Sequence, residues 1–289
     1  MRHNILSLSQ TDKHLTFILR LCALLSAAVI LLILIFLLNE SLSIFQHVSV
    51  SRFINDASWH PQQGLYNITP MLSATILSTV GALILATPLG IASALFSYFY
   101  APKFLATWYR RLIELLAGIP SVVYGLWGLT TLAPLIAQLH PPGVSLLTAI
   151  LILSLMVLPT VALTVEAAIA AVPASYLQGA MALGLSRWTS IKCIILPAAH
   201  SGITSGILLA TGRAIGETMA VLMVAGNVVQ HPHSLFDSVR TLTANIALEM
   251  AYAMGDHRAA LFVSGLVLMI MVLLLVFMAA FFKRKPAYV

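Results

Sequence analysis

The sequence has little charge. Asp, Glu, Lys and Arg together make up 8% of the 289 residues, whereas about 25% is usual in soluble domains. Fifteen basic and nine acidic side chains are too few to cover the surface of a water-soluble fold of this length. Hydrophobic residues reach 60%, above the roughly 45 to 50% of soluble chains. The composition therefore predicts a membrane protein, in which the net charge of +6 reports topology and not nucleic-acid binding.

The sequence also lacks the residue patterns of metal, nucleotide and hydrolase sites. Its two cysteines, Cys22 and Cys193, lie far apart, which predicts neither a disulfide framework nor a metal cluster. His231 and His233 flank a proline without a nearby cysteine or a third ligand, so we interpret them as part of a solvated turn. No GxxxxGKS, GxxxxGKT, HExxH or GxSxG pattern occurs. The chain is therefore expected to hold no metal or cofactor of its own and to leave ATP to another protein.

Six hydrophobic stretches are each long enough to cross a bilayer. A helix rises about 1.5 Å per residue, so about 20 apolar residues cross the roughly 30 Å of hydrocarbon. The first stretch is too long for a signal peptide and has no small-residue cleavage site after it, which indicates an uncleaved anchor. The predicted fold class is all-α and polytopic. The six predicted spans are 17–38, 73–98, 115–136, 144–165, 202–229 and 259–282.

The basic residues predict the orientation of these spans. Lys and Arg near span ends are retained in the cytoplasm. One side carries Arg2, Lys13, Arg20, Lys103, Arg110, Arg111, Arg187, Lys192, Lys283, Arg284 and Lys285, and the other carries Arg52, Arg240 and Arg258. We therefore expect cytoplasmic termini, two outside loops at 39–70 and 230–258, and an inside loop at 166–201. The remaining basic residue, Arg213, lies within the fifth predicted span.

The inside loop is predicted to be structured. Residues 175–183 have helix-forming composition, and Gly184 can adopt the positive φ that ends a helix. Ser186 is a good N-cap for a second helix, which Pro197 is expected to end. From the residues alone, these two short helices are either a docking element or an amphipathic segment that rests on the bilayer.

The same loop resembles the pattern of ABC importer permeases, which is written EAA, three residues, Gly, nine residues, Ile, one residue, Leu, Pro. The matching residues are Gln178, Gly179 and Ala180 in place of EAA, then Gly184, Ile194, Leu196 and Pro197 at the family spacing. The resemblance implies a coupling loop at about 173–200 that seats in a groove of an ATPase subunit. Gln178 replaces the usual glutamate and removes a charge from that contact.

Four further stretches of the sequence resemble the PstC-type permeases of phosphate-specific ABC importers. They are IELLAGIPSVVYGLWGL at 113–129, LPT at 158–160, GRAIGETMAV at 212–221 and TLTANIALEM at 241–250. The resemblance implies a type I importer fold (MetI-like) and a permease that translocates inorganic phosphate across the bacterial inner membrane. It also implies a homologous A-type permease, two copies of a cytoplasmic ATPase that bind ATP and Mg, and an external phosphate-binding protein. Residues 1–58 would hold the N-terminal segment, the first span and the start of an outer loop, and residues 59–289 would hold the permease domain.

The fifth predicted span contains an arginine and a glutamate. Arg213 and Glu217 are four residues apart, which predicts that they share one helix face and can pair. A cation that faces lipid costs ~2.5 to 3.5 kcal/mol on insertion scales, so both residues are expected to face a partner helix or a water-filled path. We interpret Arg213 as a donor fork for a phosphate oxyanion. Glu217 would hold that fork between passages, or accept a hydrogen bond from a protonated phosphate. The alternative is a buried ion pair that only fixes helix register.

Small residues predict close helix packing along the same span. Those that recur at helical spacing are Gly202, Gly206, Ala210 and Ala220, and a second GxxxG pair is formed by Gly212 and Gly216. Small residues let helix backbones approach each other closely in a membrane. We therefore expect a neighbouring helix along this face.

The third predicted span is interrupted by glycines and prolines. They are Gly118, Pro120, Gly125, Gly128 and Pro134. Such interruptions mark either a bent helix that lines a cavity or a packing kink. Ser121 and Tyr124 are predicted to line that cavity. Glu114 lies beside Arg110 and Arg111 in sequence, which predicts an ion pair at the helix end.

The residues leave two other functions open. The loop pattern alone fixes only the ABC class, so molybdate, sulfate or a phosphonate is an alternative substrate. A membrane signalling or scaffold subunit that reports phosphate status would tolerate neutralisation of Arg213, whereas a conduit would not. An intramembrane enzyme is not supported, because Ser, His and acidic residues do not converge on neighbouring spans.

Overall fold

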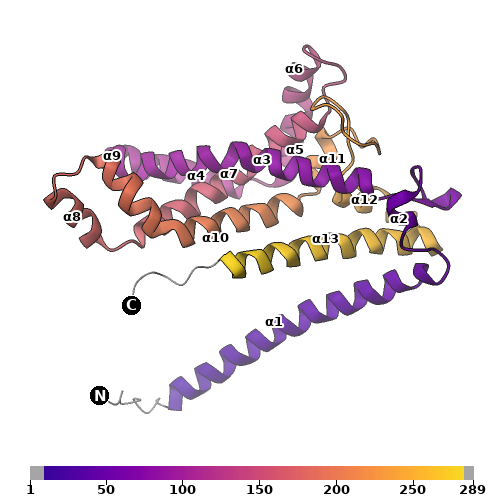
Figure 1. Cartoon of the computed structure of the whole chain (residues 1–289), viewed down its shortest axis with the longest axis horizontal. Coiled ribbons are helices and arrows are strands. Elements are labelled where there is room, and N and C mark those ends of the chain that lie inside the picture. Colours follow the sequence, from indigo (N-terminus) through magenta and orange to yellow (C-terminus); the bar gives the residue numbers. More distant parts are fainter. Residues whose placement is uncertain (1–9, 283–289) are drawn as a thin grey trace.

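The computed structural model describes residues 10–282, and this part of the chain is mostly helical (Figure 1). The long helices that run side by side are α1 (Gln10–Leu42), α3 (Thr69–Leu95), α7 (Leu146–Ala170), α10 (Leu196–Ile215) and α13 (Gly255–Phe282). Among the described residues, five helices are long and apolar enough to cross a membrane, and a sixth span is reached if one bent pair is counted together. The predicted number of six spans therefore includes one broken helix.

Helix α7 lies at the centre of the bundle and packs against α3 and α10. Its side chains Ile152, Leu153 and Val157 are fully buried. Helix α3 comes so close that a Cβ on Gly90 would lie 2.7 Å from Val161 Cγ1. Association of helices in a bilayer depends on such packing, because lipid is as apolar as the side chains themselves. Small residues therefore make this core possible.

The third span is bent. Its elements are α4 (Lys103–Gly118), α5 (Ser121–Trp127), the π-helical turn η4 (Gly128–Leu132) and α6 (Ala133–Ala137). The axes before and after the break differ by 91°, and α5 and α6 rise away from the long helices in Figure 1. Pro120 lacks an N–H and disfavours helical geometry in the residue before it, so α4 ends at the break. The predicted span 115–136 is therefore a bent pair of helices, which agrees with one of the two interpretations of its glycines and prolines.

The fifth span differs from its prediction at both ends. Its elements are α9 (Arg187–Ser190), the π-helical turn η5 (Ile191–Ile195), α10 and, after a break, α11 (Met219–Val224). The helix is continuous over Arg187–Ile215, so the prediction that Pro197 ends it is wrong. Turn η5 lies directly before Pro197, where local π geometry accommodates a residue without an N–H. The continuous helix begins at Arg187 and ends at Ile215, so both ends lie earlier in the chain than the predicted bounds 202–229.

The end of the bundle opposite α8 (Ala174–Ala182) is closed by a small folded unit (Figure 1). Its elements are η1 (Ile44–Gln46), α2 (Arg52–Asn55), β1 (Trp59–His60), η2 (Pro61–Gln63) and β2 (Leu65–Tyr66), and α12 (Leu242–Glu249) packs beside them. The strands are antiparallel, with Trp59 opposite Tyr66. Phe53 stacks on Tyr66 with ring centroids 5.6 Å apart, and residues of α12 and α13 complete the core. We call residues 43–68 and 250–258 the cap.

Residues on both sides of the predicted domain boundary at residue 58 share the core of the cap. Ile44 and Phe53 belong to the same buried cluster as Trp59 and Tyr66. The division of the chain into domains 1–58 and 59–289 stays a prediction. In the cap, side chains from both sides of that boundary pack into one core.

Helix α1 lies at the edge of the bundle. It packs along α13, where Phe36 contacts Phe262 edge-on with ring centroids 5.5 Å apart, and it diverges from α13 toward its own start (Figure 1). Helix α1 begins and α13 ends toward the end of the molecule that carries α8, as expected for termini on one side of a membrane. Four basic residues used to predict that side, Arg2, Lys283, Arg284 and Lys285, lie outside the described residues.

Candidate functional site

Two helix breaks lie next to each other in the bundle. Helix α5 follows the break in the third span, and α11 follows the break in the fifth. These two helices pack so closely that a Cβ on Gly125 would lie 2.9 Å from both Ala220 Cα and Met223 Sδ. Irregular backbone at membrane depth is tolerated where it lines a cavity or is buried in protein. The paired breaks therefore mark the candidate site.

Arg213 and Glu217 lie on opposite sides of the second break. Helix α10 ends at Ile215, so the prediction that they share one helix face is wrong. The structure shows no ion pair between these two described residues. Instead, Arg213 Nη1 donates to Thr160 Oγ1 of α7 at 3.2 Å. Glu217 Oε1 accepts from the Ala220 N–H at 3.0 Å, which places this carboxylate at the start of α11.

The turn that contains Glu217 is also held from α12. The hydroxyl of Thr243 donates to the Glu217 carbonyl oxygen at 2.9 Å. On the other side, the Glu217 N–H donates to the carbonyl oxygen of Ala214 at 3.3 Å. The position of the Glu217 side chain therefore depends on α10, α11 and α12 together.

The Arg213 side chain is exposed in this chain. It ends a row of exposed residues spaced by four along α10, which are Ser201, Ser205, Leu209 and Arg213. Residues at this spacing share one face of a helix. A guanidinium within a membrane span requires water or another protein as its surroundings. This face of α10 is therefore either the wall of a water-filled path or an interface with another chain.

Tyr124 and Ser121 lie directly after the first break. Tyr124 is buried, and its hydroxyl donates to the Leu116 carbonyl oxygen at 2.9 Å. In a regular helix that carbonyl would accept from residue 120, but Pro120 has no N–H to donate. Tyr124 therefore stabilises the bend, while Ser121 is half-buried beside it. The role of both residues in lining a pathway stays a prediction.

Thr160 and Thr243 contact the candidate site but are not among the predicted site residues. Both lie in strings already noted for their resemblance, LPT at 158–160 and TLTANIALEM at 241–250. They are 53 and 26 residues away from their partners in the sequence. Helical spacing relates only residues within a few turns of one another, so it could not predict these two contacts. The usable signal was that both threonines lie in the stretches that resemble the permease family.

The inside loop forms the predicted local structure. Helix α8 is followed by Gly184 with a φ of 69°, as expected for a residue that ends a helix. The Ser186 hydroxyl accepts from the Thr189 N–H at 3.2 Å and caps α9. The predicted first helix, the glycine and the N-cap are therefore confirmed.

Helices α8 and α9 and the turn between them present apolar side chains. Met181, Leu183 and Trp188 are exposed by 60%, 79% and 56%, and we call these three residues the loop patch. Of the pattern residues, Gln178, Gly179, Gly184 and Pro197 are exposed, Ile194 and Leu196 are half-buried, and Ala180 is buried. Exposed apolar patches mark interaction sites. Docking of an ATPase at this loop stays a prediction.

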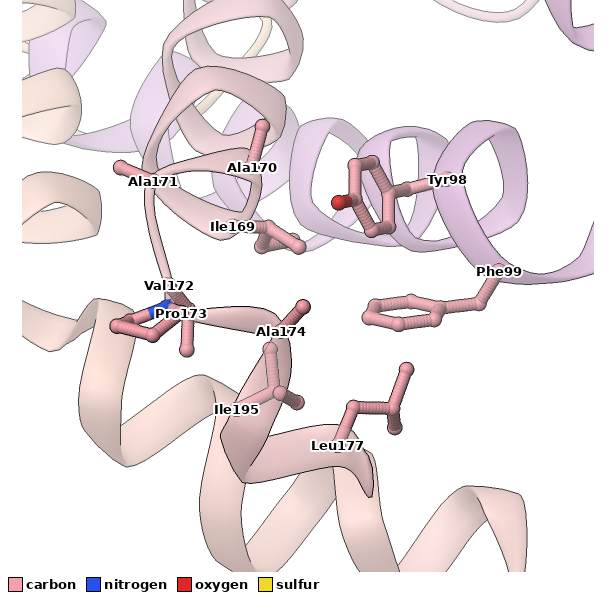
Figure 2. Close-up of a pocket in the computed structure, with 10 residues that line it drawn as sticks. All are labelled: Tyr98, Phe99, Ile169, Ala170, Ala171, Val172, Pro173, Ala174, Leu177 and Ile195. Carbon is pink, nitrogen blue, oxygen red and sulfur yellow. The ribbon is translucent and has the colours of Figure 1, made fainter. Parts of the chain in front are cut away.

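Two cavities flank the link between α7 and α8. One has a volume of about 370 Å³ and lies between the π-helical turn η3 (Phe96–Tyr100), the end of α7, and α8. Figure 2 shows Phe99 and Leu177 pointing into it from opposite elements. The other, of about 340 Å³, lies between the link and α10. Residues 171–173 line both cavities, so the link is loosely packed on two sides.

Charged residues join α4 to α7 near the α8 end. Arg110 Nε donates to Glu114 Oε1 at 3.0 Å, which confirms this predicted pair. Arg111 lies over the Trp108 ring, 5.5 Å from its centroid, so of the two neighbouring arginines Arg110 forms the ion pair. Arg110 also reaches Glu166 of α7 at 3.4 Å. Within residues 10–282, no cluster of three His, Cys, Asp or Glu side chains is arranged to hold a metal ion.

Comparison with known families decides what kind of protein carries this site. Residues 86–287 match the family of binding-protein-dependent transport system inner membrane components. The chain belongs to this family. Members are components of transport systems that depend on a binding protein. The prediction that the chain is a membrane permease subunit and not an enzyme is thereby confirmed.

Individual members of the family are similar to this chain over most of its length. YqgH of Bacillus subtilis, a probable ABC transporter permease, is 37% identical over 272 residues, which cover 91% of this chain and 88% of YqgH. The phosphate transport system permease PstC of Mesorhizobium japonicum is 32% identical over 255 residues, or 81% of this chain and 78% of that protein. PstC 1 of Mycobacterium tuberculosis is 36% identical over 247 residues, or 76% and 73%. The predicted resemblance to PstC-type permeases is confirmed.

Solved importers share the fold. A chain of a bacterial alginate ABC transporter, in complex with an alginate-bound periplasmic protein, superposes with a TM-score of 0.63 at 17% identity, over 94% of this chain and 96% of its own. A chain of the inward-facing MetNI methionine transporter superposes with a TM-score of 0.60 at 16% identity, over 80% of this chain and 100% of its own. At these identities the likeness concerns the fold alone. The predicted MetI-like importer fold is confirmed.

Proposed function

We propose that this chain is the permease subunit that carries inorganic phosphate through an ATP-driven importer of the bacterial inner membrane. The observation that carries the proposal is the exposed Arg213 guanidinium next to a helix break, in a member of this permease family. The similarity to PstC proteins at 32% and 36% identity supports phosphate over other oxyanions.

Arg213 is suited to a tetrahedral oxyanion. A guanidinium has five N–H donors in one plane, and the contact of Nη1 with Thr160 Oγ1 at 3.2 Å orients that plane. The remaining donors can form two parallel hydrogen bonds with a phosphate. A hydrogen bond to a charged group contributes ~1.5 to 3 kcal/mol, and each ~1.4 kcal/mol is a factor of ten. Loss of the guanidinium is therefore expected to lower uptake at least roughly tenfold.

Glu217 is the candidate group for discrimination between anions. Its Oε1 is bound to the start of α11 and not to Arg213, so we do not assign to it the holding of the guanidinium. The role that we propose is acceptance of a hydrogen bond from a protonated phosphate oxygen. Sulfate has no proton to donate at neutral pH, and a polar group left without its partner penalises the wrong substrate.

Three surfaces are proposed for three partners. The Arg213 face of α10 would meet a homologous A-type permease across the path. The loop patch would seat on one of two copies of a cytoplasmic ATPase, which would bind ATP and Mg. The cap would receive an external phosphate-binding protein. Basic residues such as Lys103 and Arg187 gather near the α8 end, which supports a cytoplasmic position for this end and for both termini.

Helix α8 would transmit the movement of the ATPase. The link at 171–173 lies between two cavities, and Gly184 at the other end of α8 has nothing within 4 Å of a Cβ position. Both ends of α8 therefore leave room for reorientation. Closure of the ATPase pair would push α8 and rock the spans between inward-open and outward-open states.

Reconstitution tests this function. The chain is assembled with an A-type permease, the ATPase and the phosphate-binding protein in liposomes, and ATP-dependent uptake of labelled phosphate, sulfate and molybdate is compared. We expect phosphate uptake, and we expect Arg213→Ala to lower it at least roughly tenfold. The control Arg111→Gln removes a basic side chain from α4 and should leave uptake within about twofold of the unmodified complex.

Each other outcome points to a different function. Preferred uptake of sulfate or molybdate would assign another oxyanion to the permease. Unchanged phosphate uptake in an assembled Arg213→Ala complex would contradict the conduit and favour a signalling or scaffold subunit.

A further inference from the structure

Glu249 forms a buried junction between four segments of the chain. It is the last residue of α12 and is only 8% exposed. Its Oε1 accepts from Arg240 Nη1 at 2.7 Å, and its Oε2 accepts from Trp59 Nε1 at 2.9 Å. His257 Nε2, from α13, lies 2.8 Å from Oε2, within hydrogen-bond distance. The junction joins β1, the segment before α12, α12 itself and α13.

Arg240 extends this junction to α11. Its Nε donates to the Asn227 carbonyl oxygen at 2.9 Å, and its Nη1 also donates to Asn245 Oδ1 at 3.1 Å. Asn227 has a φ of 57°, and its Nδ2 donates to the Leu222 carbonyl oxygen of α11 at 2.7 Å. Asparagine tolerates this left-handed conformation because its short polar side chain can form a local hydrogen bond, as it does here with Leu222. Glu249 is therefore connected through Arg240 to the last turn of α11.

The other end of α12 contacts the candidate site. Thr243 donates to the Glu217 carbonyl oxygen at 2.9 Å, and the Leu242 N–H donates to Thr75 Oγ1 of α3 at 3.0 Å. Helix α12 has 8 residues, which corresponds to a length of about 12 Å. One end of this short rigid element is fixed in the cap, and the other holds the turn that follows Arg213.

The cap presents an exposed apolar surface beside the junction. Val50, Ile54, Tyr252 and Met254 are exposed by 61%, 59%, 56% and 83%. Tyr252 contacts the ring of His257 with centroids 5.8 Å apart, and His257 in turn contacts Glu249. Exposed apolar surface of this kind marks contact with another protein or with the membrane, and members of this family depend on a binding protein. A protein that docks on the cap would therefore touch a side chain that leads directly to Glu249.

We propose that α12 is a strut that couples docking of an external soluble protein on the cap to the position of the Glu217 turn. Glu249 and Thr243 are positioning residues in this assignment. Neither touches the transported anion, and together they fix where Glu217 lies. The inference rests on the proposed function, because it needs an importer whose ATP hydrolysis is stimulated by its binding protein.

The test separates positioning from stability. Complexes with Glu249→Gln, Thr243→Val and Thr243→Ser are reconstituted, and ATP hydrolysis is measured with and without the phosphate-loaded binding protein. Glu249→Gln keeps the shape of the side chain and loses the charge that holds Arg240, while Thr243→Val keeps the shape and loses the hydroxyl. Both should keep basal hydrolysis within about twofold and lose stimulation by about tenfold. Thr243→Ser keeps the hydroxyl and should keep the stimulation.

A double variant and a control sharpen the test. Since Glu249→Gln and Thr243→Val interrupt the same connection, their combination should lose stimulation by about tenfold, and not by the product of the two losses. The control Glu114→Gln removes an exposed carboxylate that pairs with Arg110. It should leave both basal and stimulated hydrolysis unchanged.

Two results would overturn the strut. One is unchanged stimulation in both the Glu249→Gln and Thr243→Val complexes. The other is a parallel loss of basal and stimulated hydrolysis, which would indicate that these residues only stabilise the fold. A wild-type complex that is stimulated by its binding protein but takes up no phosphate would refute the proposed function without refuting the strut.

Discussion

Gly206 sets how closely α10 packs against α7. A Cβ at this position would overlap Thr164 Oγ1 and would lie 2.8 Å from Thr164 Cβ. Thr164 is not free to move aside, because its hydroxyl is bonded to the carbonyl oxygens of Thr160 and Val161 at 2.7 and 3.1 Å. The substitution Gly206→Ala would therefore force the two helices apart by roughly 1 Å to restore ordinary van der Waals contact.

Gly212 provides a matched control in the same helix. Nothing lies within 4 Å of a Cβ at Gly212. Alanine is better than glycine in a helix interior by about 1 kcal/mol, and this gain applies equally to Gly206→Ala and Gly212→Ala. Overpacking costs about 1 to 3 kcal/mol and applies only at Gly206. We expect the Gly206 variant to be less stable than the Gly212 variant by that amount, with a Tm lower by about 2 to 4 °C for each kcal/mol.

Thermal unfolding of the two purified variants in one detergent, followed by circular dichroism, measures this difference. Adding Thr164→Ala to the Gly206→Ala chain should recover part of the loss, because it removes the hydroxyl that overlaps the new methyl group. Equal Tm values for the two single variants would refute the argument from close packing.

Three further predictions concern the first break, the loop and the cap side of the molecule. Tyr124→Phe leaves the Leu116 carbonyl oxygen with only the hydrogen bond from the Ile119 N–H at 3.3 Å and should cost about 1 kcal/mol, seen as a lower Tm in the same unfolding assay. Gly184→Ala forces a β-carbon into a φ of 69° at a cost of about 1 to 2 kcal/mol, so amide hydrogen exchange should accelerate in α8 and not in α7. The backbone N–H groups of Ser234 and His233 donate to the Asp237 carboxylate and lower its pKa. The stability that these hydrogen bonds contribute is therefore fully present above the ordinary Asp pKa of about 3.9, and it is lost as the pH falls through the lowered pKa. Exchange of the Ser234 amide should accelerate over that range, and Asp237→Asn should abolish this pH dependence.

Spans could be predicted from the sequence where they are single helices. The predicted spans 73–98 and 259–282 correspond to α3 with η3 and to α13. Hydropathy adds up apolar residues in a window and contains no information on direction, so it does not detect a change of axis. At the first break Pro120 was a usable signal, because a proline restricts the residue before it. The second break, after Ile215, contains no proline.

Features of the site could be predicted where they depend on one residue and its own backbone. Gly184 and Ser186 behave as expected for this reason. Pairing of Arg213 with Glu217 required an unbroken helix, and the interaction is absent because α10 ends between them. The contact of Arg213 with Thr160 depends on how two spans pack, which no local pattern encodes.

The π-helical turn η5 holds one extra residue without changing the rotational phase of the helix that follows it. A π-helical turn holds one more residue than the α-helical turn that it replaces. Deleting a single residue within Ile191–Ile195 would therefore restore regular geometry and leave the helix downstream in nearly its present orientation. Deleting one residue from the regular helix that follows, at 198–204, would instead swing everything downstream by about 100° about the axis, and Gly206 would then point away from α7. The second deletion should therefore harm assembly far more than the first, although overall hydropathy would hardly change in either case.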